Sequence, residues 1–238
     1  MTSSTLHLSR RVQRVTLSAN AAAGARAAAL AAQGRDVITL TSGEPDFDTP
    51  EAIKQAAVSA MARGETKYTH TAGTPALRQA VSRKYARENA LDYSAAEVIV
   101  SNGGKQVIAN AFAATLDDGD EVVLPAPYWP SFPDIVRVSD GTPVIVPCTE
   151  ATAFKLGAAA LEAAITPRTR WLVLNTPGNP TGAVYTKREL AALADVLRRH
   201  PQVWVLLDEI YEHIWFGTTA PAHLLHVAPD LKDRTLLV

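Results

Sequence analysis

The 238-residue sequence lacks the features that would tie it to an oxidising compartment, to nucleic acid or to a membrane. Cys148 is its only cysteine, so an internal disulfide is impossible and a reducing cytoplasm is the expected location. A formal net charge of -1 at pH 7 gives no general attraction to nucleic acid or to anionic lipid. No apolar run approaches the roughly 20 residues that cross a bilayer. We therefore expect a cytoplasmic protein whose partners are neither nucleic acid nor membrane.

Metal-ligand spacing is lacking as well. The histidines fall at irregular intervals, and the single cysteine has no second thiol to bind a metal with. We expect surface or packing roles for His70, His200, His213, His223 and His226, and no metal site. What the chain does have is 47% hydrophobic residues, which is enough for a buried core and argues against disorder.

The second part of the chain alternates short apolar runs with amphipathic segments. Strands are predicted at 98–101, 121–124, 142–147, 171–174, 203–207 and 235–238, and helices at 104–115, 130–138, 156–165 and 187–199. An earlier strand is predicted at 37–40, and two further helices begin after Thr49 and after Thr74. This alternation predicts an α/β fold with a mainly parallel sheet that helices cover.

The most informative stretch is V-W-V-L-L-D-E-I-Y at 203–211. An apolar run that ends in carboxylates is typical of a buried strand whose carboxyl end faces a ligand. Asp208 next to apolar walls needs a cationic partner, because an unpaired buried charge is costly. A protonated ring nitrogen would supply that partner, and Tyr211 could place a phenol beside a ring oxygen. The alternative is that Asp208 and Glu209 simply cap a following helix.

Three other predicted strands also end in distinctive segments. S-N-G-G-K at 101–105 suits a phosphate held by a helix N-terminus, although a tight strand-to-helix turn would explain its glycines equally well. P-A-P-Y-W at 125–129 could form an aromatic wall for a flat ring or could be simple packing. N-T-P-G-N-P-T-G at 175–182 fixes the amide of Asn179 in an irregular turn. Together the four segments describe a pocket for a flat, phosphorylated, N-protonated ring, which is pyridoxal 5'-phosphate.

These segments also carry a family resemblance. S-G-E-P-D-F-D-T-P, K-Y-T-x-x-x-G-T-P, G-G-K-Q, P-Y-W, N-P-T-G and D-E-I-Y-E occur in this order, and the set resembles the class I aminotransferases of fold type I, most of all the bacterial aspartate aminotransferases. The resemblance implies an N-terminal arm with part of a small domain at 1–48, and a cofactor-binding large domain at 49–238. It implies an enzyme that moves an amino group between an amino acid, with aspartate expected, and a 2-oxo acid.

The resemblance assigns roles around the cofactor ring and the substrate. Asp208 would pair with the pyridinium nitrogen, Trp129 would stack on the ring, and Asn179 and Tyr211 would bond the ring's 3'-oxygen. Gly43 would contact the substrate carboxylate through its backbone, with Trp129 and Asn179 also lining the substrate site.

The phosphate end of the cofactor is assigned in the same way. Gly103, Gly104 and Lys105 match the family's phosphate-binding turn. Tyr68 matches a tyrosine that reaches the phosphate held by the neighbouring subunit, so the resemblance implies a homodimer with shared sites.

One expected residue has no match in the chain. The family's Schiff-base lysine stands in a Ser-x-x-Lys context shortly after the strand predicted at 235–238, so we expect it to lie beyond Val238 and expect no catalytic residue among these 238. The chain as given is then expected to be inactive. The alternatives are the same fold acting on aromatic amino acids or prephenate, and a non-catalytic remnant that binds only cofactor or a partner subunit.

Overall fold

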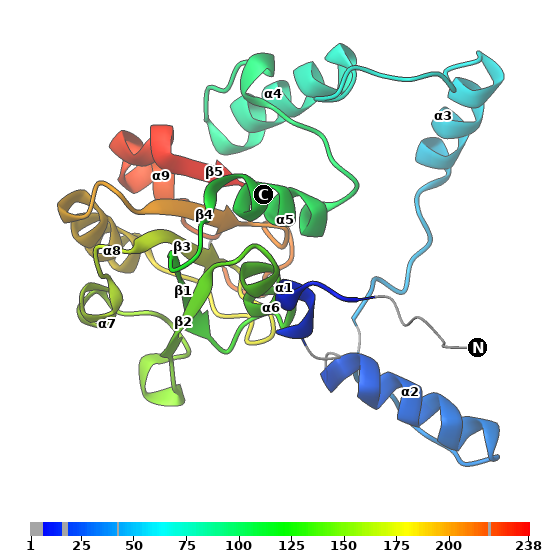
Figure 1. Cartoon of the computed structure of the whole chain (residues 1–238). Helices are drawn as coiled ribbons and strands as arrows, with labels where there is room; N and C mark the ends of the chain where they lie inside the picture. Colours follow the sequence, from blue (N-terminus) through cyan, green and yellow to red (C-terminus); the bar gives the residue numbers. More distant parts are fainter. Residues whose placement is uncertain (1–6, 16–18, 42, 219) are drawn as a thin grey trace.

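The computed structural model of the chain describes residues 7–15, 19–41, 43–218 and 220–238. Its centre is a sheet of five parallel strands in the order β2-β1-β3-β4-β5 (Figure 1). The strands are β1 (Glu121–Ala126), β2 (Thr142–Pro147), β3 (Thr169–Asn175), β4 (Trp204–Asp208) and β5 (Thr235–Leu237). The chain runs outward from β1 to β2 and then returns to the other side of β1 as β3. The strand order therefore reverses at β1, and in such sheets the ligand crevice lies outside the carboxyl ends near that reversal.

Helices and short 3-10 turns connect and cover the strands. The helices are α1 (Arg10–Gln13), α2 (Ala19–Ala32), α3 (Glu51–Ala62), α4 (Pro75–Asn89), α5 (Gly104–Thr115), α6 (Ser131–Val138), α7 (Ala158–Ala164), α8 (Lys187–Arg199) and α9 (Leu224–Val227). The 3-10 turns are η1 (Ala95–Glu97), η2 (Glu150–Thr152) and η3 (Pro229–Arg234). Figure 1 shows α2 and α3 standing away from the sheet. The boundary expected near residue 48 remains a prediction.

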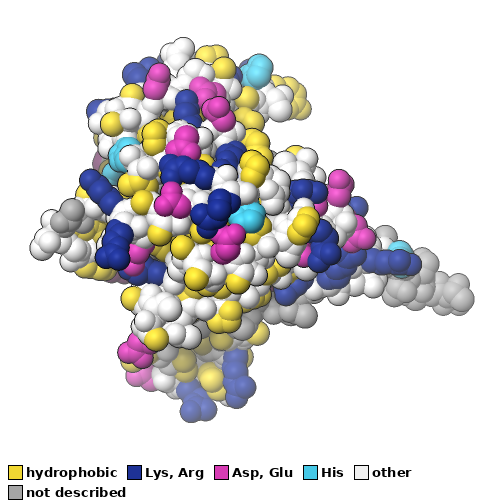
Figure 2. All heavy atoms as spheres, turned by 90° about the vertical axis from the view of Figure 1, so that its left-hand side faces the viewer, with side chains coloured by type: hydrophobic (Ala, Val, Ile, Leu, Met, Phe, Trp, Pro, Cys, Tyr) yellow, Lys and Arg dark blue, Asp and Glu magenta, His cyan; other side chains and the backbone are white. Residues whose placement is uncertain are grey.

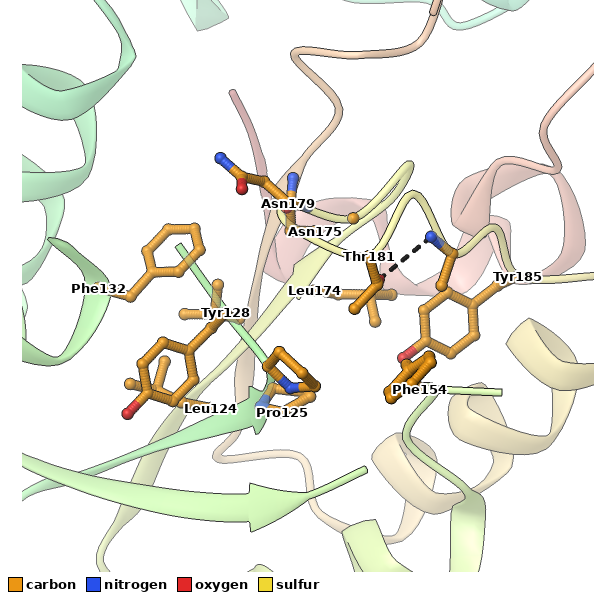
Figure 3. Close-up of a pocket in the computed structure, with 14 residues that line it drawn as sticks. Leu124, Pro125, Tyr128, Phe132, Phe154, Leu174, Asn175, Asn179, Thr181 and Tyr185 are labelled. Carbon is orange, nitrogen blue, oxygen red and sulfur yellow. Dashed lines mark hydrogen bonds between the residues drawn. The ribbon is translucent and has the colours of Figure 1, made fainter. Parts of the chain in front are cut away.

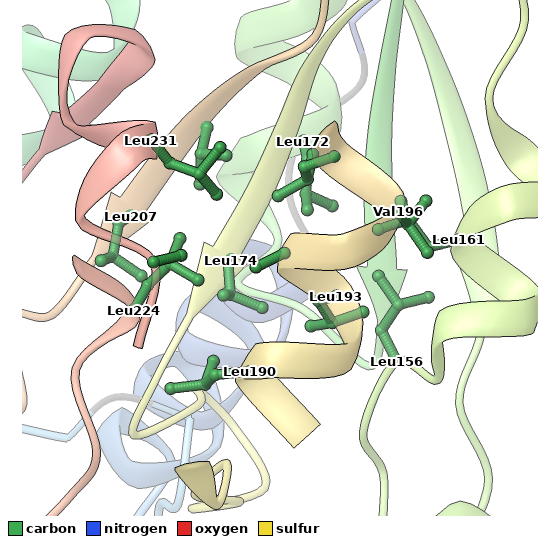
Figure 4. Packing of buried hydrophobic residues seen from close by; sticks show 14 of the residues in the cluster. Leu156, Leu161, Leu172, Leu174, Leu190, Leu193, Val196, Leu207, Leu224 and Leu231 are labelled. Atoms are coloured by element: carbon green, nitrogen blue, oxygen red, sulfur yellow. The ribbon is translucent and has the colours of Figure 1, made fainter. Parts of the chain in front are cut away.

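Each face of the sheet buries its own apolar cluster, because successive strand residues point to opposite faces. On one face, α7, α8, α9 and η3 cover alternate residues such as Leu172, Leu174 and Leu207 (Figure 4). On the other, α5 and α6 cover the intervening residues, among them Val173 and Leu206. The predicted α/β fold with a helix-covered parallel sheet is confirmed, and every strand pairing among the described residues is parallel.

The two edges of the sheet are chemically different. β2 pairs with β1 and carries prolines at positions 143 and 147, the second and last residues of the strand. β5 pairs with β4 among the described residues and consists of Thr235, Leu236 and Leu237. Prolines lack the backbone N–H that a neighbouring strand would use.

Two of the predicted strands are wrong. The described backbone at 37–40 forms no strand, and Ile38 and Leu40 are almost fully exposed. Residues 98–101 follow η1 as irregular chain, in which the Val100 N–H donates to the Ala72 carbonyl oxygen. Short apolar runs become strands only where a neighbouring strand satisfies their backbone groups, and neither run has such a neighbour in the described structure.

The outer face over α7, α8 and α9 carries basic and acidic side chains interspersed (Figure 2). Arg198 bridges Asp195 and Asp230, and Arg199 pairs with Glu162. Such a mixed surface offers no single-sign field to a polyanion. Among the described residues, no helix is both long and apolar enough to cross a membrane.

Helix α8 begins with a reciprocal cap that its sequence specifies. The Glu189 N–H donates to Thr186 Oγ1 at 3.3 Å, and the Thr186 N–H donates to Glu189 Oε2 at 2.7 Å. Thr186→Ala removes the hydroxyl acceptor, so we expect the free energy of unfolding to fall by about 0.5–2 kcal/mol in urea denaturation. Thr186→Ser keeps the acceptor and is the matched control. Equal losses in the two variants would show that the cap hydroxyl does not stabilise α8.

Candidate active site

A cavity of about 250 Å³ opens at the carboxyl ends of β3 and β4, beside the start of α5. Six of the residues singled out in the sequence line it, namely Gly104, Lys105, Trp129, Asn179, Asp208 and Tyr211. They come from four segments that follow one another over more than 100 residues of sequence. The cavity lies at the edge where the parallel topology directs ligands.

Asp208 is the last residue of β4 and is only 7% exposed. Among the described residues its carboxylate accepts one hydrogen bond, from the Ile210 N–H to Oδ1 at 3.2 Å, and forms no ion pair. Burial raises the pKa of Asp208 above its ordinary range, and the Glu209 carboxylate adds to this rise, while the Ile210 hydrogen bond opposes it. Asp208 is therefore a buried acid in need of a positive partner on the cavity side.

A hydrogen-bonded chain fixes the turn after β3 to the end of β4. Asn175 Nδ2 donates to the Asp208 carbonyl oxygen at 3.0 Å, and Asn175 Oδ1 accepts from the Asn179 N–H at 2.7 Å. The Asn179 side chain then reaches Tyr211, with its Nδ2 3.4 Å from the phenol oxygen. An amide and a phenol thus converge on one point of the cavity, where both can bond a single ligand oxygen.

The opposite wall is the N-terminus of α5. Gly103 precedes the helix with φ +85°, a left-handed conformation that favours glycine. The first N–H groups of a helix have no carbonyl within the helix to bond, and the helix dipole is positive there. Gly104 lines the cavity, and a Cβ at this position would lie 3.3 Å from Val238 Cγ1. This end of the cavity is suited to an anion that approaches the backbone closely.

Lys105 and Trp129 form a cation–π pair beside this anion-binding end. The Lys105 Nζ lies 4.9 Å from the centre of the Trp129 ring, and Trp129 packs in a T-shaped arrangement with Phe132, with 5.3 Å between ring centres. Two neighbours therefore fix the indole, which makes it a rigid wall for a flat ligand.

The neighbouring Tyr128 serves a different space. It lines a small, mostly apolar pocket of about 30 Å³ together with Phe132 and Tyr185. Figure 3 shows Asn175 and Asn179 at one side of this pocket and Phe154 and Tyr185 at another. The space is too small for an aromatic ring, so P-A-P-Y-W contributes Trp129 to the cavity and Tyr128 to the packing beneath the turn.

Three predicted residues do not line the cavity. Gly103 lies next to it as the residue before α5. Gly43 lies in the exposed segment before α3, and the Tyr68 side chain is fully exposed after α3. The roles of Gly43 and Tyr68 remain predictions, and the expected role of Tyr68 concerns a neighbouring subunit.

Sequence reasoning missed four lining residues, Ile108, Asn175, Ile210 and Val238. Asn175 had a readable signal, since it is a polar residue at the end of an apolar strand, directly before the T-P-G-N-P turn. Val238 had none, because its place in the wall depends on β5 pairing next to β4.

An acidic cluster outside the cavity brings Glu88, Glu212 and His213 within 4.8 Å of one another. Lys84 lies among them, paired with Glu212 and 3.9 Å from Glu88 Oε2. The ammonium group supplies the positive charge that these carboxylates need, and the cluster gives no case for a metal ion.

Comparisons with known proteins agree with this geometry. The family profile described as aminotransferase class I and II matches residues 35–238. An aspartate/prephenate aminotransferase from Cereibacter sphaeroides is 53% identical over 232 residues, which are 96% of this chain and 57% of that protein. An aspartate aminotransferase from Rhizobium meliloti is 52% identical over 215 residues, covering 90% of this chain and 52% of the relative. The crystal structure of the aspartate aminotransferase from Rhizobium meliloti superposes with a TM-score of 0.94 at 48% identity, covering 97% of this chain and 58% of that one. The chain thus spans a little over half the length of these relatives.

Proposed function

Since this chain belongs to the class I and II aminotransferase family, we propose that it forms the cofactor-binding part of a pyridoxal-phosphate-dependent enzyme. That enzyme transfers an amino group between an amino acid and a 2-oxo acid. The observation that carries the proposal is Asp208, a buried carboxylate that lines the cavity and has no cationic partner among the described residues. A protonated pyridine nitrogen is the partner that this acid requires.

The cavity walls fit the remaining groups of the cofactor. The N–H groups at the start of α5 and the Lys105 ammonium would hold the phosphate. Trp129 would stack on the ring, and Asn179 with Tyr211 would bond the ring's phenolic oxygen, since their polar atoms already lie 3.4 Å apart.

Once bound, the cofactor supplies an electron sink for breaking a bond at the amino acid's Cα. Asp208 would keep a proton on the ring nitrogen, because a carboxylate next to the pyridinium favours its charged form. The Asn175 hydrogen bonds would hold Asn179 at the ring oxygen and join it to the Asp208 backbone. Trp129 would fix the plane in which the substrate reacts.

We propose aspartate as the amino donor and 2-oxoglutarate as its acceptor, on the strength of relatives named aspartate aminotransferases. The name of the Cereibacter sphaeroides relative supports prephenate as a second acceptor. The test is a chimera that joins this chain to the remaining length of the Rhizobium meliloti enzyme. We expect amino transfer from aspartate, and failure with aspartate but turnover with aromatic amino acids would reject the proposed donor.

Further roles are proposed for residues outside the cavity. The backbone of Gly43 would contact the substrate carboxylate, and Tyr68 would reach the phosphate bound by a partner subunit. This requires a homodimer, and the full exposure of Tyr68 leaves its side chain accessible to a second copy. A cytoplasmic location is proposed because the sequence has one cysteine.

The lysines of the chain lead to a direct test. Of its seven lysines, Lys105 lines the cavity, at the end proposed for the phosphate and away from the covalent role that the family gives to another lysine. We expect the 238 residues alone to bind pyridoxal 5'-phosphate without covalent attachment and to show no turnover.

The measurement is equilibrium dialysis with pyridoxal 5'-phosphate, followed by borohydride reduction and peptide mass spectrometry. Retention of cofactor with every lysine unlabelled is the expected result. Lys187, exposed at the start of α8, reports non-specific labelling. Stoichiometric labelling of Lys105 would mean that its role has been assigned wrongly.

A further inference from the structure

A second buried carboxylate stands directly behind Asp208. The side chain of Glu209 is 12% exposed, and its Oε2 lies 2.9 Å from Nε2 of His223, whose side chain is 6% exposed. The two atoms are within ion-pair distance, but their geometry does not meet the criteria for a hydrogen bond. His223 precedes α9, which covers the sheet face opposite to α5. Glu209 and His223, which are not neighbours in the sequence, are thus in contact behind the cavity.

The second ring nitrogen of His223 determines its tautomer. Nδ1 accepts a hydrogen bond from the Leu225 N–H at 3.0 Å, and so serves as the N-cap of α9. A nitrogen that accepts a hydrogen bond carries no proton, so the ring proton must lie on Nε2. His223 therefore presents its Nε2–H side to the Glu209 carboxylate.

The environment of Glu209 contains other titratable groups. Asp208 precedes it on the chain, Tyr85 and Tyr93 lie close to it from α4 and the segment after α4, and the His226 ring lies 5.1 Å from the His223 ring. Burial raises the pKa of Tyr85 and of Tyr93 to about 12, with Glu209 adding to the rise, so both phenols are neutral at physiological pH. Across the sheet, Lys105 lines the cavity with Asp208. Among the described residues, His223 is the one side chain in polar contact with Glu209.

Strand alternation explains why this matters for the cavity. Asp208 shares the sheet face of Leu206, and the His223 contact places Glu209 toward the face of Leu207. Burial is the main cause of the raised pKa of Asp208, and repulsion from the adjacent Glu209 carboxylate raises it further. The residue that fixes the position of Glu209 therefore contributes to the electrostatic environment of Asp208, the acid proposed to pair with the ring nitrogen.

We propose that His223 is a positioning residue, which holds Glu209 on the far side of the sheet and thereby keeps Asp208 ionised in the cavity. The inference rests on the proposed function only in taking Asp208 as the partner of the cofactor's ring nitrogen.

Two substitutions separate the two contacts of His223. The Oδ1 of His223→Asn can still accept the Leu225 N–H, because Asn is a good N-cap residue, but its side chain is too short to reach Glu209. The side-chain amide of His223→Gln extends to the position of Nε2 and can donate to Glu209, while the cap is lost. If His223 serves only to cap α9, the titration midpoint of Asp208 should change in His223→Gln. If His223 positions Glu209, the midpoint should change in His223→Asn.

The readout is the titration of Asp208 in the cofactor-free 238-residue chain. Carbon-13 NMR of protein labelled at the aspartate carboxyl carbons follows each acid, and the signal missing from Asp208→Asn identifies Asp208. We expect Glu209→Gln to lower the titration midpoint of Asp208 because a like charge is removed, and His223→Asn to raise it. His223→Gln should retain the wild-type midpoint, and His223→Asn should have no effect once Glu209 is Gln.

An unchanged midpoint in His223→Asn, or equal shifts in the Asn and Gln variants, would overturn the inference. Binding of pyridoxamine 5'-phosphate to the same proteins tests the proposed function separately. If the Asp208 midpoint shifts as expected but the protein does not bind pyridoxamine 5'-phosphate, only the cofactor proposal is rejected. If the protein binds but the midpoint does not shift, only the role of His223 is rejected. If both proposals are correct, the pH below which binding weakens should shift together with the Asp208 midpoint.

Discussion

The Asp208→Asn substitution is expected to weaken binding of pyridoxamine 5'-phosphate by about 10- to 150-fold, which is the cost of losing a hydrogen bond to a charged group. The amide keeps the size of the carboxylate but cannot offer an anion to the ring nitrogen. Fluorescence titration of the 238-residue chain at neutral pH measures the loss. Asp118→Asn is the matched control, because Asp118 is exposed in the turn before β1.

The same substitution should stabilise the protein at neutral pH. Because burial raises the folded-state pKa of Asp208 above its ordinary value of 3.8, ionisation costs more in the folded than in the unfolded chain. Stability is therefore lost as the pH rises from 3.8 through the folded pKa, and an amide avoids this loss. The gain of the variant over the wild type should vanish at acidic pH, where Asp208 of the wild type is protonated in both the folded and the unfolded chain. If Asp208→Asn bound pyridoxamine 5'-phosphate as tightly as the wild type, Asp208 would not be the partner of the ring nitrogen.

Phe112→Ala should lower the free energy of unfolding by about 3–5 kcal/mol. Phe112 is fully buried on α5 and packs edge-on against Trp171 of β3, with ring centres 5.8 Å apart. The loss would be a large part of a typical stability of about 5–15 kcal/mol, and urea denaturation measures it directly. Cofactor binding should weaken as well, because α5 carries the anion-binding turn into the cavity.

Leu77→Ala on α4 is the control for this loss, since Leu77 is 46% exposed and its truncation should change stability by no more than about 0.5 kcal/mol. The loss in free energy of unfolding for Phe112→Leu should lie between those of Phe112→Ala and Leu77→Ala, because leucine leaves a smaller cavity than alanine. Similar losses for Phe112→Ala and Leu77→Ala would show that α5 is not held by its buried face.

The fold could be predicted from the sequence wherever local pattern and sheet pairing agree. Helix α8 (Lys187–Arg199) has the predicted bounds, because its cap and its apolar stripe specify the same register. Strand β4 is recognisable since its apolar run is long enough to be buried on both faces. Residues 37–40 and 98–101 carry similar but shorter runs, and whether such a run pairs depends on neighbours that the local sequence does not specify.

The site was predictable to the extent that its chemistry lies at strand ends. Trp129, Asn179 and Asp208 lie at or shortly after the ends of readable strands, and parallel topology alone brings such ends to one edge. Gly104 was expected after a strand at 98–101, but in the structure irregular chain precedes it. The contact between Glu209 and His223 could not be read from the sequence, because it depends on how α9 packs on the sheet. A lone histidine 14 residues after an acid gives no periodic signal.

The unlike edges of the sheet determine where this protein can recruit another strand. At the β2 edge, Pro143 and Pro147 remove N–H donors, so an incoming chain would find an incomplete ladder and self-association there is discouraged. At the β5 edge, Thr235–Leu237 contains no proline, so the backbone N–H groups that face away from β4 are intact. Any further polypeptide that extends the sheet should therefore add next to β5. For the same reason β5 is the edge through which cross-β aggregation would begin if it were left bare.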